Sequence, residues 1–265
     1  MCLVNFHFQD HPIYQLIVVA NRDEFYERPT AAAHFWKDEP TILAGRDLAM
    51  MGTWLGVTRD GRFAALTNYR DSSLPETGQK SRGEIVSDFL AGKETPAEFI
   101  GRLTKNKDHY GGFNVIVCDG KTLLHYNNIM NELNEITPGT HSLSNHSLDT
   151  PWPKVVKGKE RLAKYVRANQ RQLEIEALFN IVSDRKRAAD AELPLTGVSL
   201  EMERALSPLF IQIPNYGTRC STVVLVDKAG QVSMIERTFE EGAFKEDNHF
   251  TFNIGHSLCV KDEKS

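Results

Sequence analysis

The first 24 residues constrain the fold most, because they contain two apolar runs separated by a single turn. Residues 2–8 and 16–20 are mostly apolar, β-branched or aromatic, and the turn-forming sequence Gln-Asp-His-Pro lies between them. Two antiparallel strands joined by this turn pair residues whose numbers add up to about 23. This register predicts that Cys2 lies opposite Asn21 or Arg22.

The predicted hairpin gathers groups that suit nucleophilic catalysis by Cys2. A neighbouring cation such as Arg22 favours the thiolate, which is the reactive form of cysteine, and Asp23 adds a carboxylate at the same end. We expect Met1 to be removed because the second residue is small. The α-amino group of Cys2, set free in this way, then has a pKa of about 8 and can accept the thiol proton. The alternative is a buried cysteine on a first strand, beside a solvated and salt-bridged turn.

Several motifs along the chain resemble those of a known family. They are Met-Cys at residues 1–2, ANRDEF at 20–25 with Arg28-Pro29, GTWLG at 52–56, Ser144-Asn145 followed by LDTPWPK at 148–154, and YGTRCST at 216–222. In these motifs, over almost its whole length, the chain is similar to the NRDE family, also called the transport and Golgi organisation protein two family. The resemblance implies a fold like that of the N-terminal nucleophile hydrolases, a four-layer αββα sandwich. It also implies a link to haem trafficking and lipid metabolism, as in the family's eukaryotic members.

The composition is that of an ordinary globular protein and narrows the classes of function. The chain has 265 residues, 41% of them hydrophobic and 25% charged, which is enough to bury a substantial core. Its net charge of -4 gives no reason to expect nucleic acid binding. No apolar run approaches the roughly 20 residues of a membrane span, and the N-terminus lacks the features of a signal peptide. We therefore expect a cytoplasmic protein without a transmembrane segment.

The four cysteines show no spacing typical of a metal site. Cys2, Cys118, Cys220 and Cys259 are far apart and form no Cys-x-x-Cys pair. We therefore expect no metal and no required cofactor, and we expect the last three cysteines to be buried. Haem remains a possible ligand. It would be held non-covalently, because the covalent attachment motif is absent, and nine scattered histidines do not identify an axial ligand.

The rest of the chain alternates strand hairpins and helices. Hairpins are predicted at 53–58 with 62–69, at 112–118 with 122–126, and at 220–226 with 232–238, and helices at 84–91, 96–103, 153–170, 173–183 and 200–207. Residues 142–145 are predicted to end a sheet strand. Residues 30–40 are expected to be an irregular link and residues 41–47 a short edge strand. Ser81 and Glu84 are predicted to form a capping box at the first helix.

This order of elements indicates an α+β protein with mostly antiparallel sheets. Internal repeats, low-complexity segments and linkers are absent from the sequence. We therefore predict a single domain over residues 1–265.

An oxyanion donor is expected where the second hairpin ends. Asn68 matches the asparagine that helps to bind the oxyanion in N-terminal cysteine hydrolases similar to the choloylglycine hydrolases. An amide donor in a sheltered site can contribute about 3 kcal/mol to transition-state stabilisation. Asn114 is the second choice for this role. The alternative for Asn68 is a residue that caps the following loop.

Arginines at the two ends of the last hairpin are candidates for binding a ligand. Arg219 and Arg237 could hold a carboxylate or a phosphate through paired hydrogen bonds. Asn21, next to the candidate catalytic residues, is a further ligand-binding candidate. Each arginine could equally form a structural ion pair. The basic face of the helix at 153–170 is expected to be solvated, with a phosphate-bearing ligand as the alternative.

Two functions from different classes fit these residues. The first is an N-terminal-cysteine amidohydrolase that acts on an amide or thioester of a small or lipid-like substrate. Cys2 would attack, its amino group would act as the base, Arg22 and Asp23 would fix both groups, and Asn68 would bind the oxyanion. The second function is binding and trafficking of haem or acyl-coenzyme A in the same cleft without catalysis. A fold alone does not distinguish the two.

Removal of Met1 is the first testable prediction. We expect the protein from its native cell to lack Met1, because the proposed base exists only as a free amine on Cys2. The intact mass of untagged endogenous protein measures this directly. Complete retention of Met1 would exclude the N-terminal nucleophile mechanism and leave the binding function.

Overall fold

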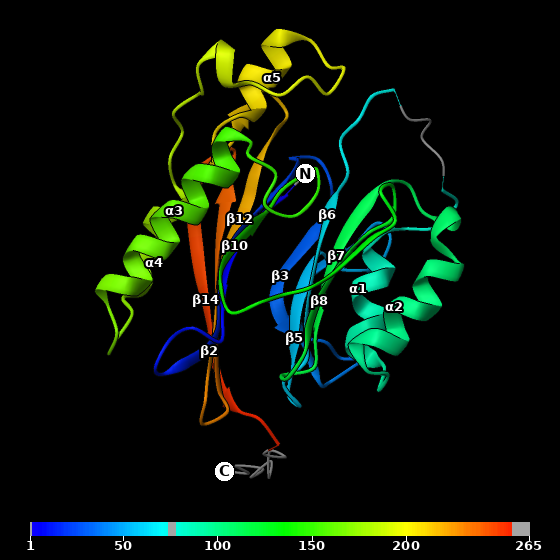
Figure 1. Cartoon of the computed structure of the whole chain (residues 1–265), viewed down its shortest axis with the longest axis vertical. Helices are drawn as coiled ribbons and strands as arrows, with labels where there is room; N and C mark the ends of the chain where they lie inside the picture. The colour runs from blue at the N-terminus through cyan, green and yellow to red at the C-terminus, as the bar shows by residue number, and fades with distance from the viewer. Residues whose placement is uncertain (1, 74–77, 256–265) are drawn as a thin grey trace, which may run out of the picture.

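The computed structural model describes residues 2–73 and 78–255, and their strands form two antiparallel sheets (Figure 1). The first sheet contains β1 (Cys2–Phe8), β2 (Tyr14–Phe25), β10 (Gly139–Leu143), β11 (Gln212–Ile213), β12 (Tyr216–Asp227), β13 (Gln231–Glu240) and β14 (Ala243–Asn253). Its order is β10-β1-β2-β12-β13-β14, and β11 pairs with β12. The second sheet contains β3 (Thr30–Phe35), β4 (Ile42–Asp47), β5 (Leu55–Thr58), β6 (Phe63–Asn68), β7 (Phe113–Cys118), β8 (Leu123–Asn127) and β9 (Glu132–Glu135), paired in sequence order.

Helices cover the outer face of each sheet (Figure 1). In the second sheet, α1 (Gly83–Ala91) and α2 (Pro96–Lys105) share one apolar core with the strands beneath them. In the first, α3 (Pro153–Ala168) and α4 (Ile175–Val182) do the same, and α5 (Leu200–Leu206) follows them. A third core fills the space between the sheets. This arrangement confirms the predicted four-layer αββα sandwich. No helix of the described residues is long and apolar enough to cross a membrane.

The side chains of β2 alternate between two buried surroundings. Val18 and Ala20 pack in the core between the sheets, whereas Ile17 and Val19 pack against the helices. Successive residues of a strand point to opposite faces of its sheet, so a strand that is buried on both faces needs an apolar residue at nearly every position. This requirement explains the unbroken apolar runs in the first hairpin.

The register of the first hairpin agrees with one of the two predicted pairings. Cys2 lies opposite Arg22, and Leu3 lies opposite Asn21. On the other side of β2, Arg22 also lies opposite Cys220 of β12. Arg22 is therefore flanked by a cysteine on each neighbouring strand, and the three side chains share one face of the sheet.

Edge strands account for most differences from the predicted elements. Residues 30–40 are not an irregular link, because β3 occupies Thr30–Phe35 and forms the edge of the second sheet. As a result β4, which was expected at the edge, lies inside the sheet. The strands β9 and β14 were not predicted, and the hairpin of β12 and β13 is therefore not the last one. These edge strands are half exposed and carry no continuous apolar run, so their sequences give little strand signal.

The capping box predicted at Ser81 and Glu84 is wrong. The residue that precedes α1 is Arg82, without a side-chain cap, and Ser81 Oγ accepts only from the backbone N–H of Gly83. The Glu84 carboxylate instead accepts from Lys80 Nζ at 3.0 Å and from a tyrosine hydroxyl at 2.7 Å. A capping box is present at α2, where the Thr95 side chain and Glu98 bond each other's backbone N–H groups.

Glu236 of β13 connects the two sheets. Its side chain is 2% exposed, and its Oε1 accepts from the backbone N–H of Ala33 in β3 at 2.6 Å. The pairing of β3 with β4 shifts register between Ala31 and His34, so Glu236 satisfies a backbone donor at an irregular point of the ladder. Burial raises the pKa of the Glu236 carboxyl above its ordinary value.

Gly158 lets α3 lie close to β1. The Asn5 side chain beneath it is fully buried, accepts from Ser142 Oγ at 2.8 Å and donates to the Val19 carbonyl at 3.2 Å. A Cβ atom on Gly158 would lie 2.3 Å from Asn5 Oδ1, a distance that real atoms do not adopt. The glycine therefore fixes how the N-terminal half of α3 is placed over the sheet.

We expect Gly158→Ala to destabilise the protein by about 1 to 2 kcal/mol. Alanine is a better helix former by about 1 kcal/mol, but the added methyl displaces Asn5 and costs more than this gain. Gly101→Ala is the matched control, because Gly101 lies within α2 and no atom lies within 4 Å of its added Cβ. The free energy of unfolding of this control should increase by about 0.5 to 1 kcal/mol. Urea unfolding measures both, and equal gains in the two variants would contradict the close packing at Asn5.

Candidate functional site

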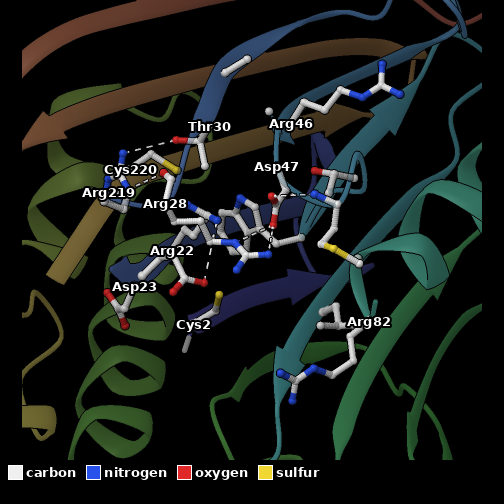
Figure 2. A pocket seen from close by; sticks show the side chains of 18 of the residues that line it. Cys2, Arg22, Asp23, Arg28, Thr30, Arg46, Asp47, Arg82, Arg219 and Cys220 are labelled. Atoms are coloured by element: carbon white, nitrogen blue, oxygen red, sulfur yellow. Dashed lines mark hydrogen bonds and ion pairs between the residues drawn. The ribbon is translucent and has the colours of Figure 1, made fainter. Parts of the chain in front are cut away.

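A cavity of about 600 Å³ is lined by residues of both sheets and of the segment that leads into α1 (Figure 2). Its lining has seven basic and five acidic residues, whereas the whole chain has a net charge of -4. The arginines among its lining residues are Arg22, Arg28, Arg46, Arg82 and Arg219. Such a cavity favours a ligand or a reaction intermediate that carries negative charge.

Cys2 lies in this cavity at the start of β1. The residue is 7% exposed, and Figure 2 shows its thiol directed toward the cavity below Arg22. Its carbonyl oxygen accepts from Ser144 Oγ at 3.2 Å. Burial raises the pKa of the Cys2 thiol and the Asp23 carboxylate raises it further, whereas Arg22 lowers it. A reactive thiolate at this position therefore depends on nearby cations.

Arg22 lies between two thiols on the cavity face of the first sheet. Its side chain is 10% exposed, and the nearest carboxylate oxygen, Glu24 Oε2, is 4.0 Å from its Nη2 atom. This distance is too long for a hydrogen bond. The charge of Arg22 is therefore available to Cys2 and to whatever enters the cavity.

Asp23 follows Arg22 in β2 and therefore belongs to the helix-facing side of the strand, and it is still among the residues that line the cavity (Figure 2). It is 1% exposed, and its Oδ1 accepts from Thr218 Oγ1 at 2.8 Å. Burial raises the pKa of the Asp23 carboxyl, and the positive charge of Lys154 is the largest of the named side-chain effects that lower it. Lys154 was not predicted from the sequence to have a role in the site. The sequence feature that could have indicated a role for Lys154 is its position at the end of the LDTPWPK motif, where a helix begins.

Ser144 and Asn145 connect Cys2 with Asn68. Asn68 ends β6 and lines the cavity, as predicted. Its carbonyl oxygen accepts from Asn145 Nδ2 at 2.9 Å, while the preceding Ser144 donates to the carbonyl of Cys2. Arg70 N–H in turn donates to the Asn145 carbonyl at 2.7 Å. Two adjacent residues after β10 thus hold the candidate nucleophile in one sheet and the candidate oxyanion donor in the other. This dipeptide belongs to one of the sequence motifs, but no role was predicted for it.

Asn21 and Arg237 lie outside the cavity lining, although both were predicted to bind a ligand. Asn21 is fully buried, donates to two backbone carbonyls at 2.9 Å and accepts from Ser221 Oγ. Arg237 pairs with Glu176 of α4 and with Asp247, the latter at 2.7 Å. Both side chains stabilise contacts within the first sheet and its helices. The structural ion pair that was the alternative for Arg237 is the arrangement observed.

Asn114 also lies away from the cavity lining, in a polar network between the sheets. Its Oδ1 accepts from Asn127 Nδ2 at 2.8 Å and lies 3.0 Å from His125 Nε2, and its Nδ2 donates to Thr67 Oγ1 at 3.3 Å. These contacts occupy both ends of the amide. These contacts indicate a structural role for Asn114 and not the second-choice role as an oxyanion donor.

Arg219 lines the cavity and has only uncharged hydrogen-bond acceptors. Its guanidinium donates to the carbonyls of Phe25 and Arg28, at 2.7 and 3.1 Å, and to Thr30 Oγ1 at 3.3 Å. Burial lowers the pKa of the Arg219 side chain. Its position is consistent with the predicted binding of an anionic group.

Two other arginines of the cavity have carboxylate partners. Arg28 Nη2 lies 2.7 Å from Asp47 Oδ2, and Arg46 pairs with Asp38. Their charges are therefore largely compensated. Groups of three or more potential metal ligands are absent from the described part of the chain.

A family model described as Transport and Golgi organisation 2 matches residues 1–241 of this chain. A relative from Bos taurus, the Transport and Golgi organization protein 2 homolog, is 35% identical over 258 residues and is aligned over 90% of this chain and 93% of its own length. Transport and Golgi organization protein 2 of Drosophila melanogaster is 27% identical over 264 residues, with 90% and 92% covered.

Solved structures with a similar fold include a conjugated bile acid hydrolase from Clostridium perfringens. A mutant of that enzyme matches with a TM-score of 0.53 and 9% identity over 96% of this chain and 98% of its own. A second variant matches with a TM-score of 0.51 and 9% identity, over 99% and 100%. At this identity the similarity shows the fold, which is that of the N-terminal nucleophile hydrolases.

We expect iodoacetamide to alkylate Cys2 faster than Cys118, Cys220 or Cys259. Cys259 lies outside the described residues, so the structure bears on the first three of these cysteines. Burial raises the pKa of Cys118 to about 12, and burial together with Glu236 raises that of Cys220, although Arg22 lowers the latter. At Cys2 the rise caused by burial is opposed by the positive N-terminus and by Arg22. Because the pKa of Cys2 is itself raised, its labelling should still be increasing with pH above 9. Mass spectrometry of labelled peptides, as a function of time, gives the three rates.

Arg22→Ala should slow the labelling of Cys2 by about 3- to 10-fold at a fixed pH, because it removes the cation that favours the thiolate. Arg102→Ala is the control, since Arg102 is exposed on α2 and pairs with Glu94, which precedes the helix. Equal rates for the three cysteines, or an unchanged Cys2 rate in Arg22→Ala, would contradict this electrostatic role.

Proposed function

Because this chain belongs to the Transport and Golgi organisation 2 family and has the fold of the N-terminal nucleophile hydrolases, we propose that it is an N-terminal-cysteine amidohydrolase. Its substrate would be an amide or thioester of a small or lipid-like molecule. The observation that supports this proposal is the position of Cys2. The thiol lies in a cavity, beside a cation, at the start of the first strand.

In the proposed reaction the Cys2 thiolate attacks the substrate carbonyl. A thioester to Cys2 forms, the C–N or C–S bond to the leaving group breaks, and water then hydrolyses the thioester. The α-amino group freed by removal of Met1 takes the thiol proton and delivers it to the leaving group. Arg22 stabilises the thiolate from the cavity side. Asn68 donates to the oxyanion at the end of β6.

The surroundings of Cys2 support a substrate with an apolar and an anionic part. Trp54 and Leu66 line the cavity and offer apolar contacts to an acyl group. Arg219 offers a charge that no carboxylate among its hydrogen-bond partners compensates. We infer a cytoplasmic protein, in which Cys2 would remain reduced.

A second candidate function is the binding and transfer of haem or acyl-coenzyme A in the same cavity. The arrangement of Arg219 favours it, because both ligands carry carboxylate or phosphate groups. The described residues that line the cavity include no histidine. A protein ligand to haem iron would therefore be a sulfur atom of Cys2, Cys220 or Met50. In this function the cysteine is a ligand and not a nucleophile.

Cys2→Ala distinguishes a catalyst from a carrier. In an enzyme it should reduce turnover by orders of magnitude while affinity changes by only a few fold, because the walls of the cavity remain. In a carrier, Arg219→Ala should weaken binding by roughly 10- to 100-fold, because a charge-assisted hydrogen bond contributes about 1.5 to 3 kcal/mol.

The measurements are a screen of amide and thioester substrates and binding titrations with haem and long-chain acyl-coenzyme A. Arg237→Ala is the control for Arg219→Ala, because Arg237 lies outside the cavity lining. Full turnover in Cys2→Ala would exclude the hydrolase function. Wild-type binding of every ligand by Arg219→Ala would exclude its pairing with anions.

A further inference from the structure

Asp149 closes a loop that begins in β10 and carries two residues of the candidate site. Its backbone N–H donates to the carbonyl of Ser142 at 2.9 Å, and its Oδ1 accepts from the backbone N–H of Ser142, also at 2.9 Å. Residues 142 and 149 are thus joined in both directions, so the segment between them returns on itself. Ser144 and Asn145 lie within this segment, which we call the 142–149 loop.

The backbone of Asp149 has a conformation that few residues tolerate. Its φ angle is +56°, in the left-handed region. Asp and Asn adopt this region more readily than most residues with a Cβ atom, because their short polar side chains bind nearby backbone groups. The carboxylate of Asp149 makes such a bond, to the N–H of Ser142. The side chain therefore helps to hold the backbone in this conformation.

The second carboxylate oxygen of Asp149 anchors the loop to β10 and to α3. Its Oδ2 lies 2.9 Å from Nδ1 of His141 in β10 and 2.9 Å from Nζ of Lys159 in α3. Burial alone would raise the pKa of the Asp149 carboxyl, but the hydrogen bonds from these two side chains and from the backbone keep this pKa below its ordinary value. One end of the loop is therefore fixed to the first sheet and to the helix that covers it.

The middle of the loop is fixed to the end of β6 in the second sheet. Thr67 Oγ1 donates to the carbonyl of Ser144, and Asn145 Nδ2 donates to the carbonyl of Asn68 at 2.9 Å. The Ser144 hydroxyl in turn donates to the carbonyl of Cys2 at 3.2 Å. The loop therefore holds the first residue of β1 and the last residue of β6 at a fixed spacing.

We propose that Asp149 is a positioning residue, whose side chain holds the 142–149 loop closed and thereby sets the position of Asn68 relative to the Cys2 thiol. This inference rests on the proposed function, in which Cys2 attacks a carbonyl and Asn68 binds the oxyanion. Asp149 is not among the described residues that line the cavity. Its loss should therefore weaken stabilisation of the oxyanion without removing a charge from beside the thiol.

Two reactions of Cys2 separate these effects. Acylation by p-nitrophenyl acetate passes through an oxyanion, because the thiolate attacks the ester carbonyl before p-nitrophenolate leaves and S-acetyl-cysteine remains. Alkylation by iodoacetamide displaces iodide from a CH₂ group and forms no oxyanion, so it depends on the thiolate. The test is the ratio of the acylation rate to the alkylation rate at one pH, for the full chain. Initial release of p-nitrophenolate, less that of Cys2→Ala, gives the first rate, and peptide masses give the second.

Asp149→Gly removes the side chain but still permits the left-handed backbone, and it should lower the ratio by about 10- to 100-fold. Asp149→Asn keeps an oxygen acceptor for Ser142 and tolerates the positive φ, so its ratio should stay within about threefold of the wild type. Asp184→Gly is the matched control, because the Asp184 carboxylate also accepts from a backbone N–H and pairs with two basic residues of α3, but lies outside the loop and the cavity lining. Its ratio should not change.

A purely structural role for Asp149 gives a different result. The two rates would then change together, or both would stay at the wild-type value while the melting temperature falls, and either outcome in a folded variant overturns the inference. Should Asp149→Gly fail to fold, Asp149→Ser keeps a short acceptor for Ser142 and should lower the ratio by about 3- to 10-fold. Wild-type protein that releases p-nitrophenolate no faster than Cys2→Ala instead overturns the proposed function on which the inference rests.

Discussion

The pairing of β1 with strands on both of its sides is the interaction on which the candidate site depends. β1 lies between β10 and β2, and all seven of its residues are buried. The first residues of a chain usually fray unless they are held in a sheet. Here the ladder with β2 places Cys2 opposite Arg22, the ladder with β10 begins at Val4, and Ser144 donates to the Cys2 carbonyl. These contacts hold the candidate nucleophile at a defined position.

The alternation of side chains in β2 explains which site residues could be predicted. The position of the turn and the apolar pattern are local signals, and they predicted that Cys2 lies opposite Asn21 or Arg22. In the structure the partner is Arg22. Adjacent residues of a strand face opposite sides, and the sequence could not show which side held the cavity. Asn21 therefore proved to be structural, whereas Arg22 lines the cavity. The same alternation explains why Arg237, which was predicted to bind a ligand, lies outside the cavity lining.

Long-range contacts account for what the sequence could not supply. Hairpins and most helices follow from short-range patterns, and their predicted ranges overlap the observed elements. Lys154 was predicted as part of a helix, but its burial near Asp23 depends on how α3 packs on the first sheet. β3 was missed because its small residues give a weak strand signal, and Glu236 from the other sheet satisfies one of its N–H groups. Asn114 was a reasonable oxyanion candidate until the network around it was known.

The dipeptide Ser144-Asn145 makes the candidate site a product of sheet docking. Ser144 binds the strand that carries Cys2, and Asn145 binds the end of β6 at Asn68. In the proposed reaction, a chain with only the first sheet assembled would present the thiol without its oxyanion donor. The complete site would therefore depend on how the two sheets pack against each other.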